Sequence, residues 1–217
     1  MRTVRTKVYK FDELTPKAQN KAIEKLNSIN VDYEWWDFLY DDFSRICEIF
    51  GIEVDLKKTY FSGFSHQGQG SAFTGSIDIV SSCKAIKSQA WKTNYPKETF
   101  SFYTVTPAIE RVCKLIASGS IDYSAKVIPA NRETSIKTEI DIEISYYGKC
   151  DKYTRIESAI EETRELIEDL ATTLNGWFFD LLRNEYDYLT SEAAIIETLK
   201  ANEYEFLKDG SLYHNNN

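Results

Sequence analysis

The sequence has few of the residues from which metal and redox sites are usually built. It contains two histidines and four cysteines, and the cysteines lie singly along the chain, at Cys47, Cys83, Cys113 and Cys150. A zinc site needs clustered cysteine and histidine ligands, and no CxxC pair is present, so we expect no metal and no cofactor. In a reducing compartment the four thiols should stay free and mostly pack as small apolar groups.

Long apolar runs are also absent. A membrane-spanning helix needs about 18 or more consecutive apolar residues, and no stretch of the chain offers them. Residues 1–11 are basic but lack the apolar centre of a secretory signal. We therefore expect a cytoplasmic protein that does not bind membranes.

Acidic residues outnumber basic ones, giving a net charge of −8, and they are unevenly placed. Residues 31–55 contain eight acids and a single base, Arg45, whereas residues 1–10 contain four bases and no acid. The acidic stretch would repel a polyanion, so direct binding to duplex DNA is not expected. A basic protein, or a protein that itself binds nucleic acid, is the more compatible partner.

Helical periodicity and capping residues predict the helices. Thr15 followed by Pro16, and Thr106 followed by Pro107, are typical helix starts. Residues 31–51 carry an apolar stripe at helical spacing, with Asp32 as the expected cap and Gly51 at the end. Further helices are expected over residues 83–91, over 154–188 with a capping box of Thr154 and Glu157, and over 190–202 with Thr190 as cap.

Alternating apolar and polar residues predict the strands. We expect strands at 3–11, at 52–56 and 58–64 joined by a tight turn at Lys57-Lys58, at 71–80, and at 121–128 and 135–147. Asp209-Gly210 should turn a small C-terminal hairpin. Together these elements predict one α+β domain over residues 1–213, a mostly antiparallel sheet packed against helices, with a frayed tail at 214–217.

A glycine-rich stretch, Tyr60 to Gly75, reads YFSGFSHQGQGSAFTG and allows three interpretations. It can be structural, with Gly63 at a bulge and Gly68 and Gly70 at turn positions of positive φ. It can hold a ligand such as a nucleotide phosphate, because backbone N–H groups of such loops bind anions. It can also contact a protein through its phenylalanines. The candidate ligand residues are Ser65, His66, Gln67, Gly68, Gln69 and Gly70.

The stretch YEWWDFLY mixes large rings with carboxylates. Asp37 and Asp41 are spaced to share one helix face, where they could bind Mg²⁺ or act as an acid–base pair, although such faces are more often simply solvated. Tryptophan and tyrosine are common anchors of protein interfaces, and acids steer basic partners. The candidate partner-binding residues are Glu34, Trp35, Asp37, Phe38 and Asp41.

Several stretches resemble a family of uncharacterised phage and prophage proteins, some of which are labelled as antitoxins. They are VYKFDELTPKAQNKAIEKL, DYEWWDFLYDDF, GIEVD, YFSGFSHQGQGSAFTG and ANEYEFLKDGSLY, and they cover the first 75 and about the last 25 residues. The motif of that family reads Tyr-Phe-Ser-Gly-Phe, two variable residues, then Gln-Gly-Asp-Gly. This chain has Gln69 at the position of the aspartate, which argues against an acidic or metal-binding role there.

These observations favour a phage-derived acidic accessory protein that acts by binding a host or phage protein rather than by catalysis. An inhibitor of a host defence or nucleic-acid-processing system fits this description, and its location would be the host cytoplasm. The first alternative is a small-molecule or nucleotide-binding protein, or an enzyme, that uses the loop at residues 62–75. The second alternative is the antitoxin of a toxin–antitoxin pair.

Overall fold

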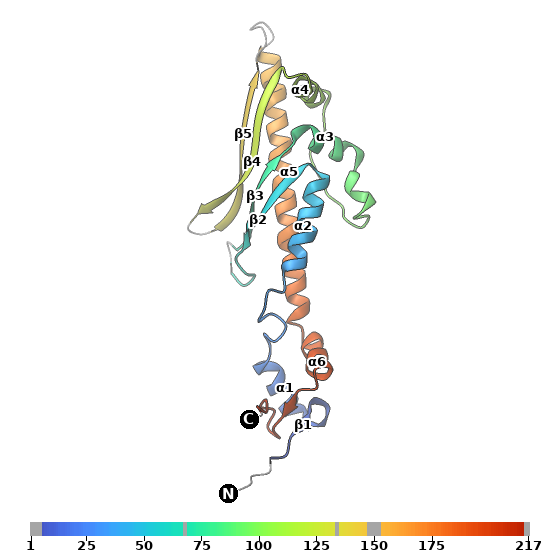
Figure 1. Cartoon of the computed structure of the whole chain (residues 1–217), viewed down its shortest axis with the longest axis vertical. Helices are drawn as coiled ribbons and strands as arrows, with labels where there is room; N and C mark the ends of the chain where they lie inside the picture. Colours follow the sequence, from blue (N-terminus) through green and yellow to red (C-terminus); the bar gives the residue numbers. More distant parts are fainter. Residues whose placement is uncertain (1–5, 67–68, 133–134, 147–152, 215–217) are drawn as a thin grey trace. The chain divides into compact units, whose positions relative to one another are not determined.

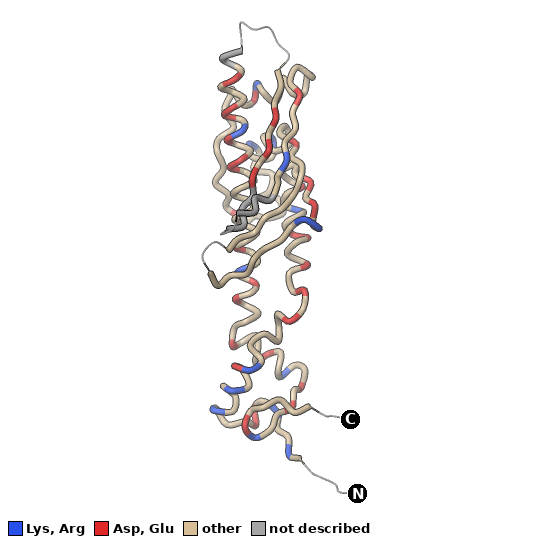
Figure 2. The backbone as a smooth tube through the Cα atoms, turned by 90° about the vertical axis from the view of Figure 1, so that its left-hand side faces the viewer, with Lys and Arg blue, Asp and Glu red and all other residues tan. Residues whose placement is uncertain are grey.

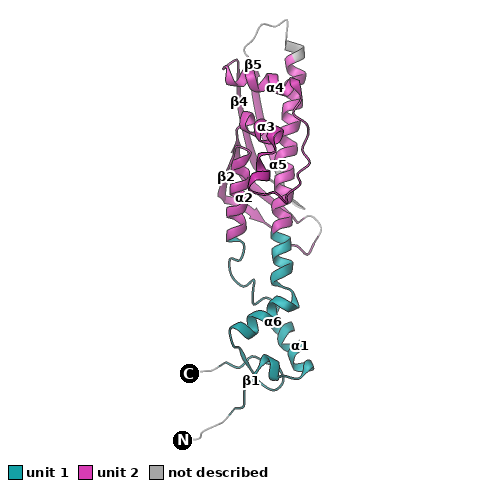
Figure 3. Cartoon of the chain, turned by 90° about the vertical axis from the view of Figure 1, so that its right-hand side faces the viewer, with its two compact units in different colours: residues 1–37, 182–217 teal, residues 38–181 magenta. Residues whose placement is uncertain are grey.

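The computed structural model describes residues 6–66, 69–132, 135–146 and 153–214, with the backbone alone at 129–132, 135–138 and 153–155. The predicted α+β class is confirmed, because α-helices accompany a four-stranded and a two-stranded antiparallel sheet. The chain divides into two compact units (Figure 3). Unit 1 comprises residues 1–37 and 182–217, and unit 2 comprises residues 38–181. That residues 1–213 fold as one domain stays a prediction.

The sheet of unit 2 is antiparallel throughout, with the strand order β2-β3-β4-β5. Its strands are β2 (Ile52–Phe61), β3 (Ser71–Ile77), β4 (Ile121–Arg132) and β5 (Ser135–Tyr146). The predicted alternation along β5 is confirmed where side chains are described. Ile142 is buried, while its neighbours Asp141 and Glu143 are exposed, so one face of the strand is wet.

Residues 52–61 form one strand, so the predicted turn at Lys57-Lys58 is wrong. Asp55 pairs with Thr74 and Tyr60 pairs with Ala72, so β2 carries extra residues in a bulge between these two pairs. The Asp55 carboxylate contacts both lysines within the bulge. It accepts the Lys57 N–H at 3.1 Å and lies 3.3 Å from Lys58 Nζ, which holds both lysines at an exposed position.

The helix α5 (Tyr153–Leu189), which belongs to unit 2 as far as residue 181, runs along one face of the sheet there, with α2 (Asp37–Ile49) beside it (Figure 1). Phe43 of α2 joins these layers, because its ring stacks on Phe178 of α5 at 4.3 Å and meets Phe73 of β3 edge-on at 5.0 Å. All three rings are fully buried. The predicted apolar stripe is therefore confirmed from Leu39 to Phe50.

One helix precedes the irregular segment 94–106 and another follows it. The helix α3 (Ile79–Ser88) begins earlier than predicted, because the Asp78 carboxylate caps it by accepting the Ser81 N–H at 3.0 Å. The helix α4 (Pro107–Ala117) begins as predicted, with Thr106 as its cap. Between them, a short 3₁₀ turn, η2 (Ala90–Thr93), places Trp91 in a cluster of rings with Phe50, Phe100 and Phe102.

The start of α5 differs from the prediction. The helix starts at Tyr153, so Thr154 lies inside it and is not its N-cap. Gly176 of α5 has open space where a side chain would stand, so no close packing contact requires a glycine there. No helix of the described chain is both long enough and apolar enough to span a bilayer.

Unit 1 is assembled from both ends of the chain. The strand β1 (Tyr9–Lys10), shorter than the predicted 3–11, pairs with β6 (Glu205–Phe206), next to the 3₁₀ turn η1 (Phe11–Glu13). The predicted helix α1 (Pro16–Lys25) is capped by Thr15, whereas α6 (Glu192–Ala201) is capped by Ser191 and not by Thr190. Their core comprises Phe11, Leu14, Ala18, Ala22, Ile195, Leu199 and Phe206.

Candidate functional site

The acidic segment, defined here as residues 33–41, follows a buried polar anchor in unit 1. Asn30 is buried and donates through Nδ2 to the Leu189 carbonyl at 3.0 Å, while its Oδ1 accepts the Thr198 hydroxyl at 2.7 Å. Both the nitrogen and the oxygen of this side-chain amide thus have a hydrogen-bond partner, as burial requires. The anchor fixes the start of the segment against the end of α5 and against α6.

Trp35 provides a second anchor, which corrects its predicted role. We expected Trp35 to lie outside as a partner-binding ring, but it is 5 % exposed and packs against Tyr186 and Trp36, with ring centres 5.9 and 5.6 Å away. The reason is that the helix begins at Asp37 and not at Asp32. The apolar stripe extrapolated back from the helix therefore assigns the two tryptophans wrongly, and Trp36 is the half-buried one.

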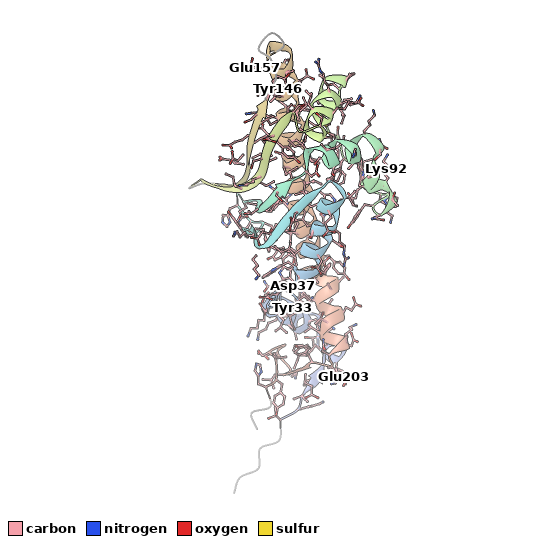
Figure 4. The ribbon with its side chains drawn as sticks, turned by 45° about the horizontal axis from the view of Figure 1, so that its top comes forward. Tyr33, Asp37, Lys92, Tyr146, Glu157 and Glu203 are labelled. Carbon is pink, nitrogen blue, oxygen red and sulfur yellow. The ribbon has the colours of Figure 1, made fainter. Side chains whose placement is uncertain are left out.

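The remaining candidates of the segment are exposed. Glu34, Asp37 and Asp41 are exposed, and Phe38, on α2, is 52 % exposed. Sequence reasoning missed Tyr33, which is 60 % exposed and lies four residues before Asp37 (Figure 4). The only signal for it was its place in the same run of rings and acids.

Free carboxylates distinguish this segment from the residues that follow it. Asp42 lies 3.2 Å from Arg45, but Glu34, Asp37 and Asp41 form no ion pair with any described residue. Asp37 and Asp41 are one turn apart on α2, as predicted. Acidic residues also occur along α5 (Figure 2), so charge alone does not single out the segment. Its distinction is that exposed rings and unpaired acids alternate along one stretch of chain.

The glycine-rich loop closes on its own side chains. The Gln69 Oε1 accepts the His66 N–H at 2.7 Å, and the Ser62 Oγ accepts the Gly70 N–H at 3.1 Å. The N–H groups of His66 and Gly70, which an anion site would need, are therefore occupied by the loop itself. Ser65 and His66 are exposed, and Gln67 and Gly68 lie outside the described residues.

The glycine roles predicted for this loop are wrong where they can be checked. Gly63, expected at a bulge, lies beyond the end of β2 and has a φ of +84°, and Gly70, expected at a positive φ, does not adopt one. Phe61 stacks on Phe64 at 5.5 Å, Phe64 contacts Phe179 of α5 at 5.4 Å, and Phe73 is fully buried. All three phenylalanines proposed for a protein contact thus pack within unit 2, although Phe61 and Phe64 are only half-buried. Within the described chain, no group of three or more His, Cys, Asp or Glu side chains could hold a metal ion.

A pocket of about 340 Å³ lies between α3 and α4, and sequence reasoning did not predict it. It is lined by two thiols, Cys83 of α3 and Cys113 of α4, and each of them alters the pKa of the other. Thirty residues separate them in the chain, and only the packing of the two helices brings them together. Their place beside the apolar residues of two successive helices was the only available signal.

Comparison with known proteins gives one match. Residues 35–192 match the model of a protein family described as "Domain of unknown function (DUF8835)". The matched stretch includes all of unit 2 and the candidate residues from Trp35 to Asp41. No curated protein and no solved structure matches the chain.

Proposed function

The chain belongs to this family, whose description assigns no activity, and we propose from the site itself that the protein acts by binding a basic protein through residues 33–41. We propose further that it is an accessory protein of a phage or prophage, and that its partner is a host protein of defence or nucleic-acid processing. The sequence resemblance supports the phage origin, and the charge of the segment supports the basic partner.

One observation carries the proposal. The ring of Phe38 is exposed to solvent, next to the carboxylates of Asp37 and Asp41, which form no ion pair with any described residue. Among the phenylalanines of the described chain, it alone has about half of its surface exposed, at 52 %. Because about half of this side chain is already covered, burying the rest would contribute roughly 1–1.5 kcal/mol, before the cost of association. A partner that covers Phe38 and places a lysine or arginine beside Asp37 and Asp41 would satisfy both the ring and the charges.

The anchoring of the segment supports a binding role. Asn30 and Trp35 are both buried within unit 1, and Tyr33 and Glu34 project from the short stretch between them. Residues presented from a fixed backbone lose less conformational entropy when a partner binds than residues of a free loop. Tyr33 is therefore presented at a low entropic cost, which is typical of an interface anchor.

The charge of the segment is tested with two matched triple variants. Glu34→Gln/Asp37→Asn/Asp41→Asn removes the three unpaired carboxylates. Glu157→Gln/Glu161→Gln/Glu168→Gln removes the same charge from exposed positions of α5, among them the labelled Glu157 (Figure 4). In affinity purification from cells that carry the gene, the first variant should lose a partner that the second retains. The wild-type interaction should weaken as salt is raised, because the charges lie in water.

The position of the contact is tested by photo-crosslinking. A benzoylphenylalanine at position 38 should crosslink one discrete basic protein, whereas the same residue at position 103 should not. Tyr103 is a suitable control because it is 58 % exposed, close to the value for Phe38. Equal crosslinking from both positions, or a partner captured equally by both triple variants, would contradict the proposed surface.

A further inference from the structure

Two free thiols line the same pocket in unit 2. Cys83 is buried on α3 and Cys113 is half-buried on α4, and each side chain alters the pKa of the other. Cys47 on α2 is also free and is fully buried. Two cysteines on packed helices can form a disulfide where their Cα atoms lie within about 7 Å. The chain thus carries a candidate dithiol at this pocket and, in Cys47, an internal control thiol.

The pocket around the dithiol has an apolar wall and a basic rim. Val80, Val105 and Ala117 line its wall, and Lys84, Lys87 and Lys114 also border it. Glu110 neutralises Lys87 through an ion pair, but Lys84 and Lys114 form no ion pair with any described residue. A small molecule that carries carboxylates therefore finds both apolar surface and positive charge at this opening.

The two thiols are not equivalent. The hydrogen bond from Cys83 lowers the pKa of the Cys113 thiol, and the same bond, together with burial, raises the pKa of the Cys83 thiol. Asp78 and Glu110 lie close enough to oppose ionisation of Cys113, and the bond from Cys83 outweighs them. The more exposed sulfur is thus also the one that ionises more readily, which is the arrangement of an attacking thiol backed by a second one.

We propose that Cys83 and Cys113 form a thiol–disulfide exchange site whose substrate is a small anionic disulfide, such as glutathione disulfide. The Cys113 thiolate attacks one sulfur of the substrate, forms a mixed disulfide and releases the first thiolate. Cys83 then attacks the Cys113 sulfur, closes the internal disulfide and releases the second thiolate. The protons of the two cysteines pass to the two thiolates, so the protein loses two electrons and one disulfide becomes two thiols.

The choice of substrate follows from the rim. Lys84 and Lys114 would attract the carboxylates of glutathione disulfide as its disulfide bond approaches Cys113 at the pocket. Once closed, the internal disulfide would join α3 covalently to α4. The site therefore also offers a way in which the oxidant could fix the packing of these two helices. This inference is independent of the proposed partner binding.

The reaction is tested on the full-length chain with glutathione disulfide, alkylation of the remaining thiols and mass spectrometry of peptides. The wild type should yield a linked peptide pair of Cys83 and Cys113 and an alkylated Cys47. Cys83→Ser should instead accumulate one glutathionyl group on Cys113, because the second step is removed. Cys113→Ser should react at least roughly tenfold more slowly, because its remaining thiol is buried and less ionised.

Two controls separate the site from general thiol reactivity. Cys47→Ala should form the linked pair at the wild-type rate. Lys84→Gln/Lys114→Gln should slow the reaction with glutathione disulfide severalfold but leave the reaction with the uncharged 2-hydroxyethyl disulfide unchanged. Circular dichroism of each variant confirms that it is folded. The proposal is overturned if the folded wild type shows no linked pair, or if Cys83→Ser and Cys113→Ser react at equal rates.

Discussion

Ser71 and Asn175 exchange hydrogen bonds across 104 residues of sequence. The Ser71 hydroxyl donates toward the Asn175 carbonyl and Oδ1, at 3.1 and 3.0 Å, and the Asn175 Nδ2 donates to the Ser71 carbonyl at 2.9 Å. Ser71 is the first residue of β3 and is 1 % exposed, so the pair fixes the start of this strand to α5. The end of the sheet next to the glycine-rich loop is thus held by side-chain hydrogen bonds as well as by the backbone hydrogen bonds between strands.

This pair predicts a measurable coupling. Ser71→Ala and Asn175→Ala should each lower the free energy of unfolding by roughly 1–3 kcal/mol, because each leaves a partly buried polar group without its partner. The double variant should lose less than the sum of the two. Urea unfolding of the three variants gives the coupling, and Ser101→Ala, at an exposed position, serves as the neutral control. Strictly additive losses would contradict the pairing.

The ring contacts of Phe43 at the centre of unit 2 should contribute more to the free energy of unfolding than the pair of Ser71 and Asn175. Phe43→Ala should lower the free energy of unfolding by about 3–5 kcal/mol, because it leaves a cavity between Phe73 and Phe178. Phe38→Ala, on the same helix but exposed, should change it by about 0.5 kcal/mol or less. Thermal unfolding of both variants tests the difference, and equal losses would show that α2 is packed in another orientation.

Three glycine-to-alanine substitutions distinguish the cost of backbone strain from the cost of a steric clash. Gly119→Ala should lose about 1–2 kcal/mol through its φ of +70° alone, because nothing lies near its added methyl group. Gly210→Ala should lose clearly more, because its φ is +83° and its methyl carbon would lie 2.1 Å from the Ala18 carbonyl oxygen. Gly176→Ala, in open space on α5, should gain about 0.5–1 kcal/mol. The ranking of the three unfolding free energies checks this series.

The ion pair of Lys21 and Asp209, 2.6 Å apart, predicts a dependence on pH. The hydrogen bond from Lys21 lowers the pKa of Asp209 from 3.8 to about 2. The folded state therefore favours the carboxylate, and its stabilising effect is fully present above pH 3.8 and is lost as the pH falls through about 2.

Unfolding of the wild type and of Asp209→Asn at a series of pH values tests this relation. The two proteins should differ above pH 3.8 and converge as the pH approaches about 2. In a Lys21→Gln background the convergence should be much reduced, because the main cause of the lowered pKa is gone. A difference between wild type and variant that is constant with pH would contradict the assignment.

Local signals in the sequence predicted some helix ends but not all of them. Thr15, Thr106 and Gly51 stand where they were expected, whereas the caps predicted at Thr154 and Thr190 are wrong. The bulge at Asp55 could not be predicted in the same way. A lysine pair between two apolar stretches fits a turn as well as a bulge, and the choice depends on the register with β3.

The candidate site was predictable only as a segment of chain. The composition of residues 33–41 indicated rings and acids, and the exposure of Phe38, Asp37 and Asp41 was correctly predicted. The burial of Trp35 and Trp36 was predicted the wrong way round. The start of a helix decides which ring points inward, and that start depends on buried contacts with Tyr186. The contact of Cys83 with Cys113 requires knowledge of how two helices pack, which a single sequence does not contain.

Unit 1 draws on both ends of the chain, and this has a consequence for synthesis on the ribosome. Residues 38–181 can begin to pack as soon as they emerge, but Phe11 and Ala18 must wait for Ile195, Leu199 and Phe206. Until residue 206 has been translated, the apolar face of α1 therefore stays uncovered. During that interval the nascent chain offers a hydrophobic surface to chaperones, and a ribosome stalled before residue 195 would leave it exposed.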